Sequence, residues 1–257
     1  GDIQITTGSL SVTNGSYLVS FASGEGDAGN ININARDTIT FEQGGASTEV
    51  ANAIGDGGDI EITTGSLFLD NRSLLATLTN GQGDAGNIKI NTRDTVTFDR
   101  ESSAITSVGS NAIGKGGNIE ITTGSLFLSN AGSLLAGTEG KGDAGKVIID
   151  AVDSISLSNS SSIRSSVFSG GEGKGGEIDL DTQTLKLIDG SQILANVFRE
   201  FGNLPGGKGR GGDININASE SVNLSGISST GFSGGIATLT ERGASGDAGN
   251  ITVTTGS

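Results

Sequence analysis

The chain lacks several residue types on which proteins commonly depend. Its 257 residues contain no cysteine, methionine, tryptophan or histidine, only one proline, and 4% aromatic residues. Without cysteine, disulfides cannot hold the fold. Without histidine and tryptophan, the commonest general base and the usual platform for sugar stacking are both missing. Because methionine is absent, residue 1 is not a translation start, and we expect a mature or excised piece of a longer protein.

Positive charge and long apolar runs are also scarce. Lysine and arginine total 15 against 29 acidic residues, which gives a formal net charge of −14. An acidic surface is repelled by phosphate backbones and anionic lipid headgroups, so nucleic acid is excluded as a partner. No apolar run approaches the roughly 18 residues of a membrane helix, so we expect no membrane insertion.

Glycine, in contrast, is abundant. The chain has 45 glycines, a share more than twice the ordinary value of about 7%. Collagen would need glycine at every third position with much proline, and a disordered chain would lack ordered aliphatic alternation. Short alternating runs such as Ile3-Gln4-Ile5 and Leu126-Phe127-Leu128 recur between glycine clusters. They predict many short strands and an all-β protein.

A repeat organises these strands. A glycine followed two residues later by isoleucine or valine recurs at intervals of 28 to 37 residues. Two types of coil alternate, and residues 27–41 match residues 84–98 at 12 of 15 positions. The spacing predicts one β-helix over residues 1–257, with about eight coils and longer corner loops at 196–211 and 231–246. The coils start at Gly1, Gly29, Gly58, Gly86, Gly117, Gly145, Gly176, Gly212 and Gly249.

Three short strands per coil predict a right-handed parallel β-helix, or β-solenoid, whose inward side chains stack from coil to coil. At about 4.8 Å per coil, the rod would be about 40 Å long. The first predicted stack includes Ile3, Ile31, Ile60, Ile88, Ile119, Val147, Ile178, Ile214 and Ile251. The second includes Leu10, Ile39, Leu67, Val96, Leu126, Ile155, Leu185 and Val222. The third includes Leu18, Leu74, Leu134 and Ile193 in one coil type, and Ile105, Ile163 and Ile227 in the other.

These units resemble a known family. The pattern of Gly58–Leu69 and that of Gly83–Thr95 are similar to the central repeats of filamentous-haemagglutinin-like exoproteins of two-partner secretion. The resemblance covers the whole chain and implies a right-handed β-helix exported through an outer-membrane partner transporter of a Gram-negative-type bacterium. It also implies an extracellular or cell-surface protein that acts in adhesion, aggregation or biofilm matrix. The Asn-Pro motifs typical of that family's secretion domain are missing, since the only proline is Pro205.

Two features of the corners resemble chemical motifs. Residues 24–29 satisfy the dinucleotide pattern GxGxxG, but a strand follows them and no helix does, so we expect no cofactor and assign the glycines to tight corners with positive φ. Asp27, Asp56 and Asp84 precede coil-opening glycines by two residues and are the candidate calcium ligands, although the tandem nonapeptide of calcium-binding β-rolls is missing. The alternative is an exposed charge ladder in which later members, Lys115 and Lys174 among them, form ion pairs with aspartates.

A second set of carboxylates bears on catalysis. Asp37, Asp94, Asp153 and Glu220 lie eight residues after every second coil-opening glycine, about 9.6 Å apart. This separation overlaps that of inverting glycosidases, which leaves a polysaccharide-processing enzyme as an alternative. An active site should interrupt the repeat locally, however, and these carboxylates follow it. We therefore predict no enzymatic activity. Threonine pairs such as Thr38 with Thr40 resemble part of a flat ice-binding threonine array. The array is not continuous, because the intervening coils carry Phe68 and Phe127 instead, so we interpret these threonines as ordinary strand residues.

The longer coils contain the main irregularity. Asn196–Gly206 combines two aromatics, an arginine and the proline. Phe198, Arg199, Phe201 and Phe232 are the candidate contacts for a receptor, a glycan or a neighbouring rod, since aromatics beside arginine are typical of binding hot spots. The alternative is that the phenylalanines fold over the wall as a local cover.

The sequence thus predicts a structural and adhesive shaft. We expect its partners to be other shafts or cell-surface glycans and proteins. Residues 1–9 and 249–257 are the same segment in register, so the chain is expected to be a window of a longer rod or a subunit that self-associates end to end. The alternatives are a polysaccharide-processing or glycan-binding β-helix and a calcium-stabilised β-solenoid.

Overall fold

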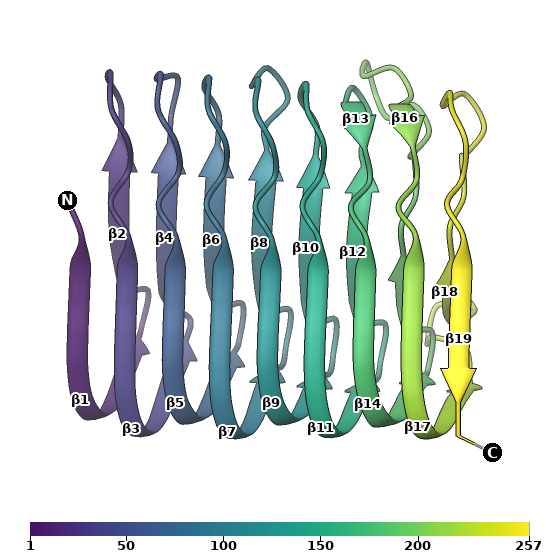
Figure 1. Ribbon diagram of the computed structural model, residues 1–257, viewed down its shortest axis with the longest axis horizontal. Coiled ribbons are helices and arrows are strands. Elements are labelled where there is room, and N and C mark those ends of the chain that lie inside the picture. The colour runs from purple at the N-terminus through teal and green to yellow at the C-terminus, as the bar shows by residue number, and fades with distance from the viewer. Residues whose placement is uncertain (257) are drawn as a thin grey trace.

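The computed structural model describes residues 1–256 and confirms the predicted parallel β-helix. In Figure 1 the chain descends along the near strands, returns up the far strands and advances one step per turn, which makes the winding right-handed. Within each of the three sheets, all neighbouring strands pair in parallel. The described residues provide no helix long and apolar enough to cross a membrane.

A nine-stranded sheet forms two of the three walls. Each of its long strands bends at a register shift, for example between Thr7 and Ser9. The residues before the bend form the first wall and those after it form the second wall. The strands are β1 (Ile3–Thr13), β3 (Ile31–Glu42), β5 (Ile60–Asp70), β7 (Ile88–Phe98), β9 (Ile119–Leu128), β11 (Val147–Leu157), β14 (Ile178–Ile188), β17 (Ile214–Ser225) and β19 (Ile251–Thr255).

An eight-stranded sheet forms the third wall. Its strands are β2 (Tyr17–Ala22), β4 (Gly45–Val50), β6 (Leu74–Thr79), β8 (Ser103–Val108), β10 (Ser133–Thr138), β12 (Ser162–Val167), β15 (Gln192–Leu194) and β18 (Gly235–Ala237). Two short strands, β13 (Glu172–Lys174) and β16 (Lys208–Arg210), pair at the corner between the third and first walls.

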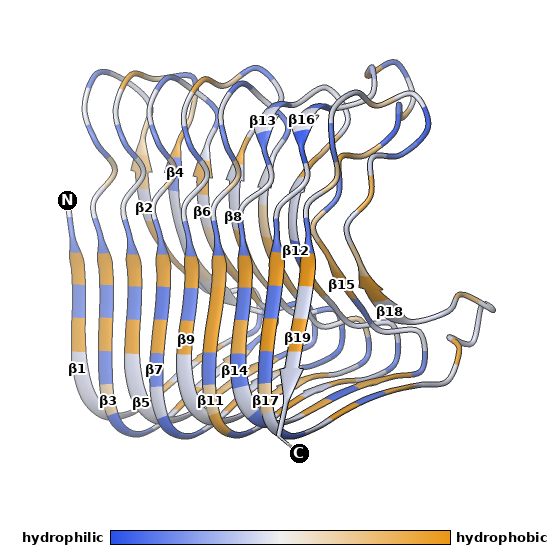
Figure 2. Ribbon diagram, turned by 45° about the vertical axis from the view of Figure 1, so that its right-hand side comes forward, coloured by the Kyte–Doolittle hydropathy of each residue, from blue (hydrophilic) through white to orange (hydrophobic). Residues whose placement is uncertain are grey.

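The first two predicted stacks are confirmed by the register. Ile31 pairs with Ile3 and with Ile60, and Ile39 pairs with Leu10 and with Leu67. Because side chains alternate across a strand, these residues all point inward, and Ile31, Ile39 and Ile60 are fully buried. The alternation is visible along the first wall in Figure 2.

The predicted third stack is wrong at three positions. The register aligns Leu75, Ala104 and Ile236 with the correctly predicted members, in place of Leu74, Ile105 and Ile227. A shift of one residue moves a side chain to the opposite face of a sheet, so Leu74 and Ile105 point outward. The inward stack is Leu18, Ala46, Leu75, Ala104, Leu134, Ile163, Ile193 and Ile236.

Large and small residues alternate in the core where the second and third walls meet. Phe98 and Ala104 face inward in one coil, whereas Leu128 and Leu134 take the equivalent places in the next. All four are buried. A phenylalanine with an alanine has as many side-chain carbon atoms as two leucines, so the large residue on one wall compensates for the small one on the other.

The coil-opening glycines form a column in which backbones touch. A methyl group added at Gly58 would overlap the carbonyl oxygen of Gly29, and one added at Gly117 would overlap that of Gly86. Close approach therefore requires glycine here, whereas the predicted positive φ occurs three residues earlier, at Gly26 and Gly55.

Buried hydroxyl groups satisfy the carbonyls of this column. Thr48, Thr77 and Thr106 on the third wall donate hydrogen bonds to the carbonyl oxygens of Gly58, Gly86 and Gly117, respectively. Ser165 donates similarly to Gly145 at 2.7 Å. These polar groups hold the corner to the third wall from inside the rod.

The change Thr106→Val tests this internal bond. Valine keeps the shape of threonine but leaves the buried Gly117 carbonyl without its hydroxyl donor, so we expect a loss of about 1–2 kcal/mol in the free energy of unfolding. Thr106→Ser keeps the donor and should cost less. Urea denaturation of both variants measures the difference, and equal stability of the valine variant and the wild type would contradict the assignment.

Candidate partner-binding cleft

The insertion in the seventh coil lies between β15 and β16. The chain takes 21 positions from Ile193 to Ile214, against 15 between their partners Ile163 and Ile178 in the preceding coil. The extra residues therefore form a loop at the corner between the third and first walls.

This loop folds back over the preceding coil. The Ser169 hydroxyl donates a hydrogen bond to the Arg199 carbonyl at 2.5 Å, and the Gly170 N–H donates to the Pro205 carbonyl at 2.7 Å. Within the loop, Phe201 and Leu204 exchange two backbone hydrogen bonds of 3.1 and 3.0 Å. These bonds fix the loop at the side of the rod.

Four residues from consecutive coils form a row under the loop. They directly follow Thr138, Val167, Val197 and Thr240, which are in parallel register with their neighbours. The row is Glu139, Phe168, Phe198 and Glu241. Its two phenyl rings are stacked with centroids 5.0 Å apart and planes inclined by 14°.

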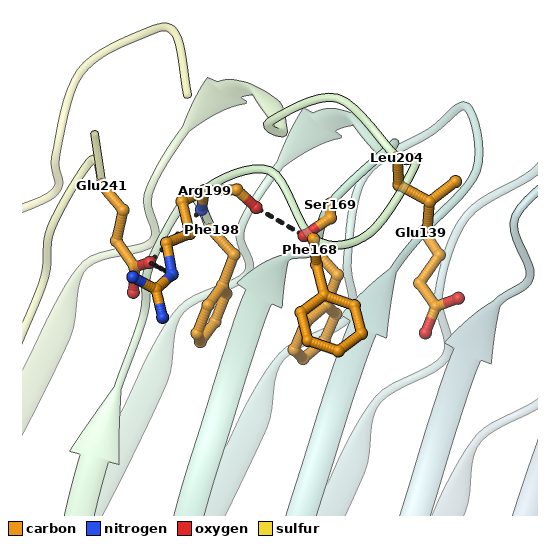
Figure 3. A pocket seen from close by; sticks show the side chains of 8 residues that line it. Glu139, Phe168, Ser169, Phe198, Arg199, Leu204 and Glu241 are labelled. Carbon is orange, nitrogen blue, oxygen red and sulfur yellow. Dashed lines mark hydrogen bonds and ion pairs between the residues drawn. The ribbon is translucent and has the colours of Figure 1, made fainter. Parts of the chain in front are cut away.

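The row and the loop enclose a cleft of about 540 Å³. In Figure 3 the labelled Phe168 and Phe198 lie between the two glutamates, with Glu139 beyond Phe168 and Glu241 beyond Phe198. Phe201 and Leu204 line the cleft from the loop. A mainly apolar cleft with a few polar groups at its ends is typical of a binding site.

The two ends of the cleft differ in charge. Arg199 lies 3.9 Å from the Glu241 carboxylate, and its backbone N–H donates to the same carboxylate at 3.3 Å. Glu139 accepts a hydrogen bond of 3.0 Å from the Ser110 hydroxyl and has no cation within ion-pair distance among residues 1–256. The Glu139 end is thus free to accept a hydrogen bond or a positive charge.

Three of the four predicted contact residues come together here. Phe198 is half-buried against Phe168, as expected for a cover, whereas Phe201 is 77% exposed, as expected for a contact surface. Arg199 is exposed at the end of the row. The sequence prediction missed Glu139 and Glu241, although all four members of the row occupy equivalent positions directly after the third wall.

Phe232 does not belong to the cleft. The chain takes 12 positions from Leu224 to Ile236, against six from Leu187 to Ile193 in the preceding coil, so the insertion lies at 226–234. The predicted loop at 231–246 is therefore misplaced, because β18 occupies part of it. Phe232 is 71% exposed on this separate loop between the second and third walls.

The corner aspartates cap backbone groups of the next coil. Carboxylate oxygens of Asp27, Asp56 and Asp84 accept hydrogen bonds of 2.7 to 2.9 Å from the backbone N–H groups of the residues one coil above. The predicted ion pairs do not form, since neither Lys115 nor Lys174 lies within 4.0 Å of a carboxylate in the described part of the chain. Asp2, Asn30, Asp59, Asn87 and Asn118 form a second capping ladder of the same kind.

This capping bears on the calcium alternative. Within residues 1–256, no group of three or more acidic or histidine side chains is arranged to hold a metal ion. We predict that calcium raises the melting temperature no more than magnesium at equal ionic strength, since each ladder carboxylate already has a donor. Thermal unfolding with either ion, and with a chelator, measures this; a rise specific to calcium and lost in Asp56→Asn would support a metal site.

The second set of carboxylates lies at the bend between the first and second walls. Asp37 is an extra residue of the bulge and does not align with Ser9, which pairs with Thr38. The Arg36 guanidinium, 2.9 Å away, holds the pKa of the Asp37 carboxyl below its ordinary value. A general acid needs a raised pKa, so Asp37 is suited to an exposed ion pair rather than to proton donation.

Comparisons with known families, curated proteins and solved structures found no match to this chain. Its resemblance to filamentous-haemagglutinin-like exoproteins therefore stays a prediction from sequence motifs.

Proposed function

We propose that the chain is a non-catalytic structural shaft of a secreted bacterial surface or matrix protein, and that the cleft under the 196–206 loop contacts its partner. The observation that supports a shaft most directly is the continuous series of paired parallel strands from β1 to β19. Backbone ladders, capping side chains and stacked aliphatics repeat from coil to coil, which suits a rod that bears load along its length.

The cleft supports an adhesive role for this shaft. It is formed by the irregular part of the rod, and irregular loops on a rigid scaffold are where binding residues concentrate. Phe201 is largely exposed, and Arg199, which lines the same cleft, lies 3.9 Å from the Glu241 carboxylate. Both residue types are enriched among the anchors of protein interfaces.

Surface display tests the proposal. Bacteria that lack their own adhesins would display the chain, and attachment and cell aggregation would be measured. We expect the displayed rod to increase both, and Phe168→Ser with Phe198→Ser to remove most of the gain. Phe68→Ser is a matched control, because Phe68 is an outward phenylalanine of the second wall that is 39% exposed. Unchanged attachment and aggregation with the wild-type rod would contradict the proposal.

A second candidate is glycan binding at the same cleft. Stacked phenyl rings beside an accepting carboxylate offer an apolar face and a hydrogen-bond acceptor, which together suit a neutral sugar. Glycan-array binding followed by calorimetry measures it. We expect Phe168→Ala to weaken a genuine hit about tenfold. Cleavage of a bound polysaccharide would instead favour the enzyme alternative.

A further inference from the structure

The outward face of the third wall differs from the other two. Outward residues of the first wall include Glu61, Lys89 and Glu120, which are paired in register. On the third wall the residues that alternate with the inward stack point outward. Many of these are apolar, among them Tyr17, Val19, Phe21, Leu74, Ile105 and Leu135.

Only two charged residues lie on this face within the described strands, and they have opposite signs. They are Glu49 on β4 and Arg164 on β12. In register, Arg164 lies between Leu135 on one side and Leu194 on the other. Its Nε is buried without a hydrogen-bond partner, and burial lowers the pKa of its guanidinium. Glu49 accepts a 2.9 Å hydrogen bond from the Asn80 amide. Neither has an ion-pair partner among residues 1–256.

The positions of these two charges are symmetric about the middle of the wall. The sheet order places β4 two strands to one side of β8, and β12 two strands to the other. A two-fold axis along β8 would therefore bring Glu49 of one copy opposite β12 of another, and Arg164 opposite β4. Glu49 and Arg164 lie in adjacent outward columns of the wall, within reach of long side chains.

We propose that this face binds the same face of a second copy, with the rods antiparallel and two reciprocal Glu49–Arg164 ion pairs. Parallel sheets that are apolar on both faces normally have both faces covered. A two-fold contact uses one self-complementary patch on both subunits, and depletion of charge at the centre of the patch is typical of an interface.

The size of the wall is adequate for such a contact. Six strands about 20 Å long and two about 10 Å long, spaced about 4.8 Å apart, give a footprint of about 670 Å² per copy. Standard interfaces bury about 800 Å² per partner. The net charge of −14 on each copy opposes association, so added salt should strengthen the dimer by screening this repulsion.

Single-cysteine crosslinking tests the axis, because the chain has no thiol of its own. Ile105 lies on β8 and would meet its own copy across the axis. We expect Ile105→Cys to be linked into a dimer by a short bis-maleimide, because facing sheets lie too far apart for a direct disulfide, and Ser156→Cys, outward on the second wall, to remain monomeric. Equal crosslinking of both variants would overturn the proposed face.

Sedimentation velocity with charge reversal tests the pairing itself. We expect a concentration-dependent dimer for the wild type, at least about tenfold weaker association for Glu49→Arg or Arg164→Glu alone, and recovery in the double variant. Circular dichroism would confirm that the variants fold. A weak interface has a Kd in roughly the micromolar range. A wild-type protein that stays monomeric up to about 100-fold above that concentration would overturn the proposal. So would a double variant that associates no better than either single one.

Discussion

Replacement of Gly117 by alanine is expected to destabilise the rod by about 4 kcal/mol or more, although it adds only one methyl group. That methyl would overlap the carbonyl oxygen of Gly86 in the coil below. The overlap involves backbone on both sides, so no side chain can move to relieve it. The two coils would have to separate, which would break their ladder hydrogen bonds and expose the core between them.

Gly24→Ala is the matched control. Gly24 has no heavy atom within 4 Å of an added methyl group and no positive φ, so we expect a change within about 0.5 kcal/mol. Denaturant unfolding followed by circular dichroism measures both variants. Similar stabilities for Gly117→Ala and Gly24→Ala would show that the glycine column does not require close backbone approach.

The losses of stability caused by Phe98→Leu and Ala104→Leu are expected to be strongly non-additive. Phe98→Leu should leave a cavity and cost about 1–2 kcal/mol, while Ala104→Leu should overpack the same coil and cost about 1–3 kcal/mol. The double variant recreates the Leu128 and Leu134 pair of the next coil and should approach wild-type stability, with a coupling energy of about 1–3 kcal/mol.

Ala46→Leu supplies the control for this cycle. Ala46 occupies the position equivalent to Ala104 two coils away, so Ala46→Leu and Phe98→Leu share no coil. Their effects should add within about 0.5 kcal/mol. If Phe98→Leu and Ala104→Leu were also additive, volume compensation within a coil would not explain the alternation of large and small residues.

Much of the fold could be predicted because the repeat is both regular and physically necessary. Each coil-opening glycine after Gly1 is required by the backbone of the coil below, and each Asp or Asn that follows one, such as Asp59, can cap the next coil. The first and second stacks follow from strict alternation of aliphatic and polar residues.

The third stack could be predicted only in part. In β6 the adjacent leucines Leu74 and Leu75 fit either face, and in β8 the correct inward residue is the small Ala104 beside the larger Ile105. In β8, hydrophobicity alone favours Ile105 as the inward residue, which is wrong. The choice depends on turn length and on the volume of Phe98 in the same coil.

The sequence predicted the contact residues of the loop, but it did not predict the row of residues that lies under the loop. Aromatics and arginine near the only proline marked Phe198, Arg199 and Phe201, because they interrupt the repeat. Glu139 and Glu241 lie about 100 residues apart and are ordinary surface residues in sequence. Only the stacking of coils brings them to the two ends of one row. Phe232 is also an aromatic residue that interrupts the repeat, but it lies in a different insertion, at another corner of the rod, and so is not part of the cleft.

The central claim, that the chain is part of a long shaft, is tested most directly by electron microscopy of the full-length protein on cells, with antibodies raised against residues 1–257. The described segment alone accounts for about 40 Å of rod, at about 4.8 Å per coil. We predict labelled fibres much longer than that, with an axial repeat of about 4.8 Å. Short, discrete labelled particles without an axial repeat would contradict the account.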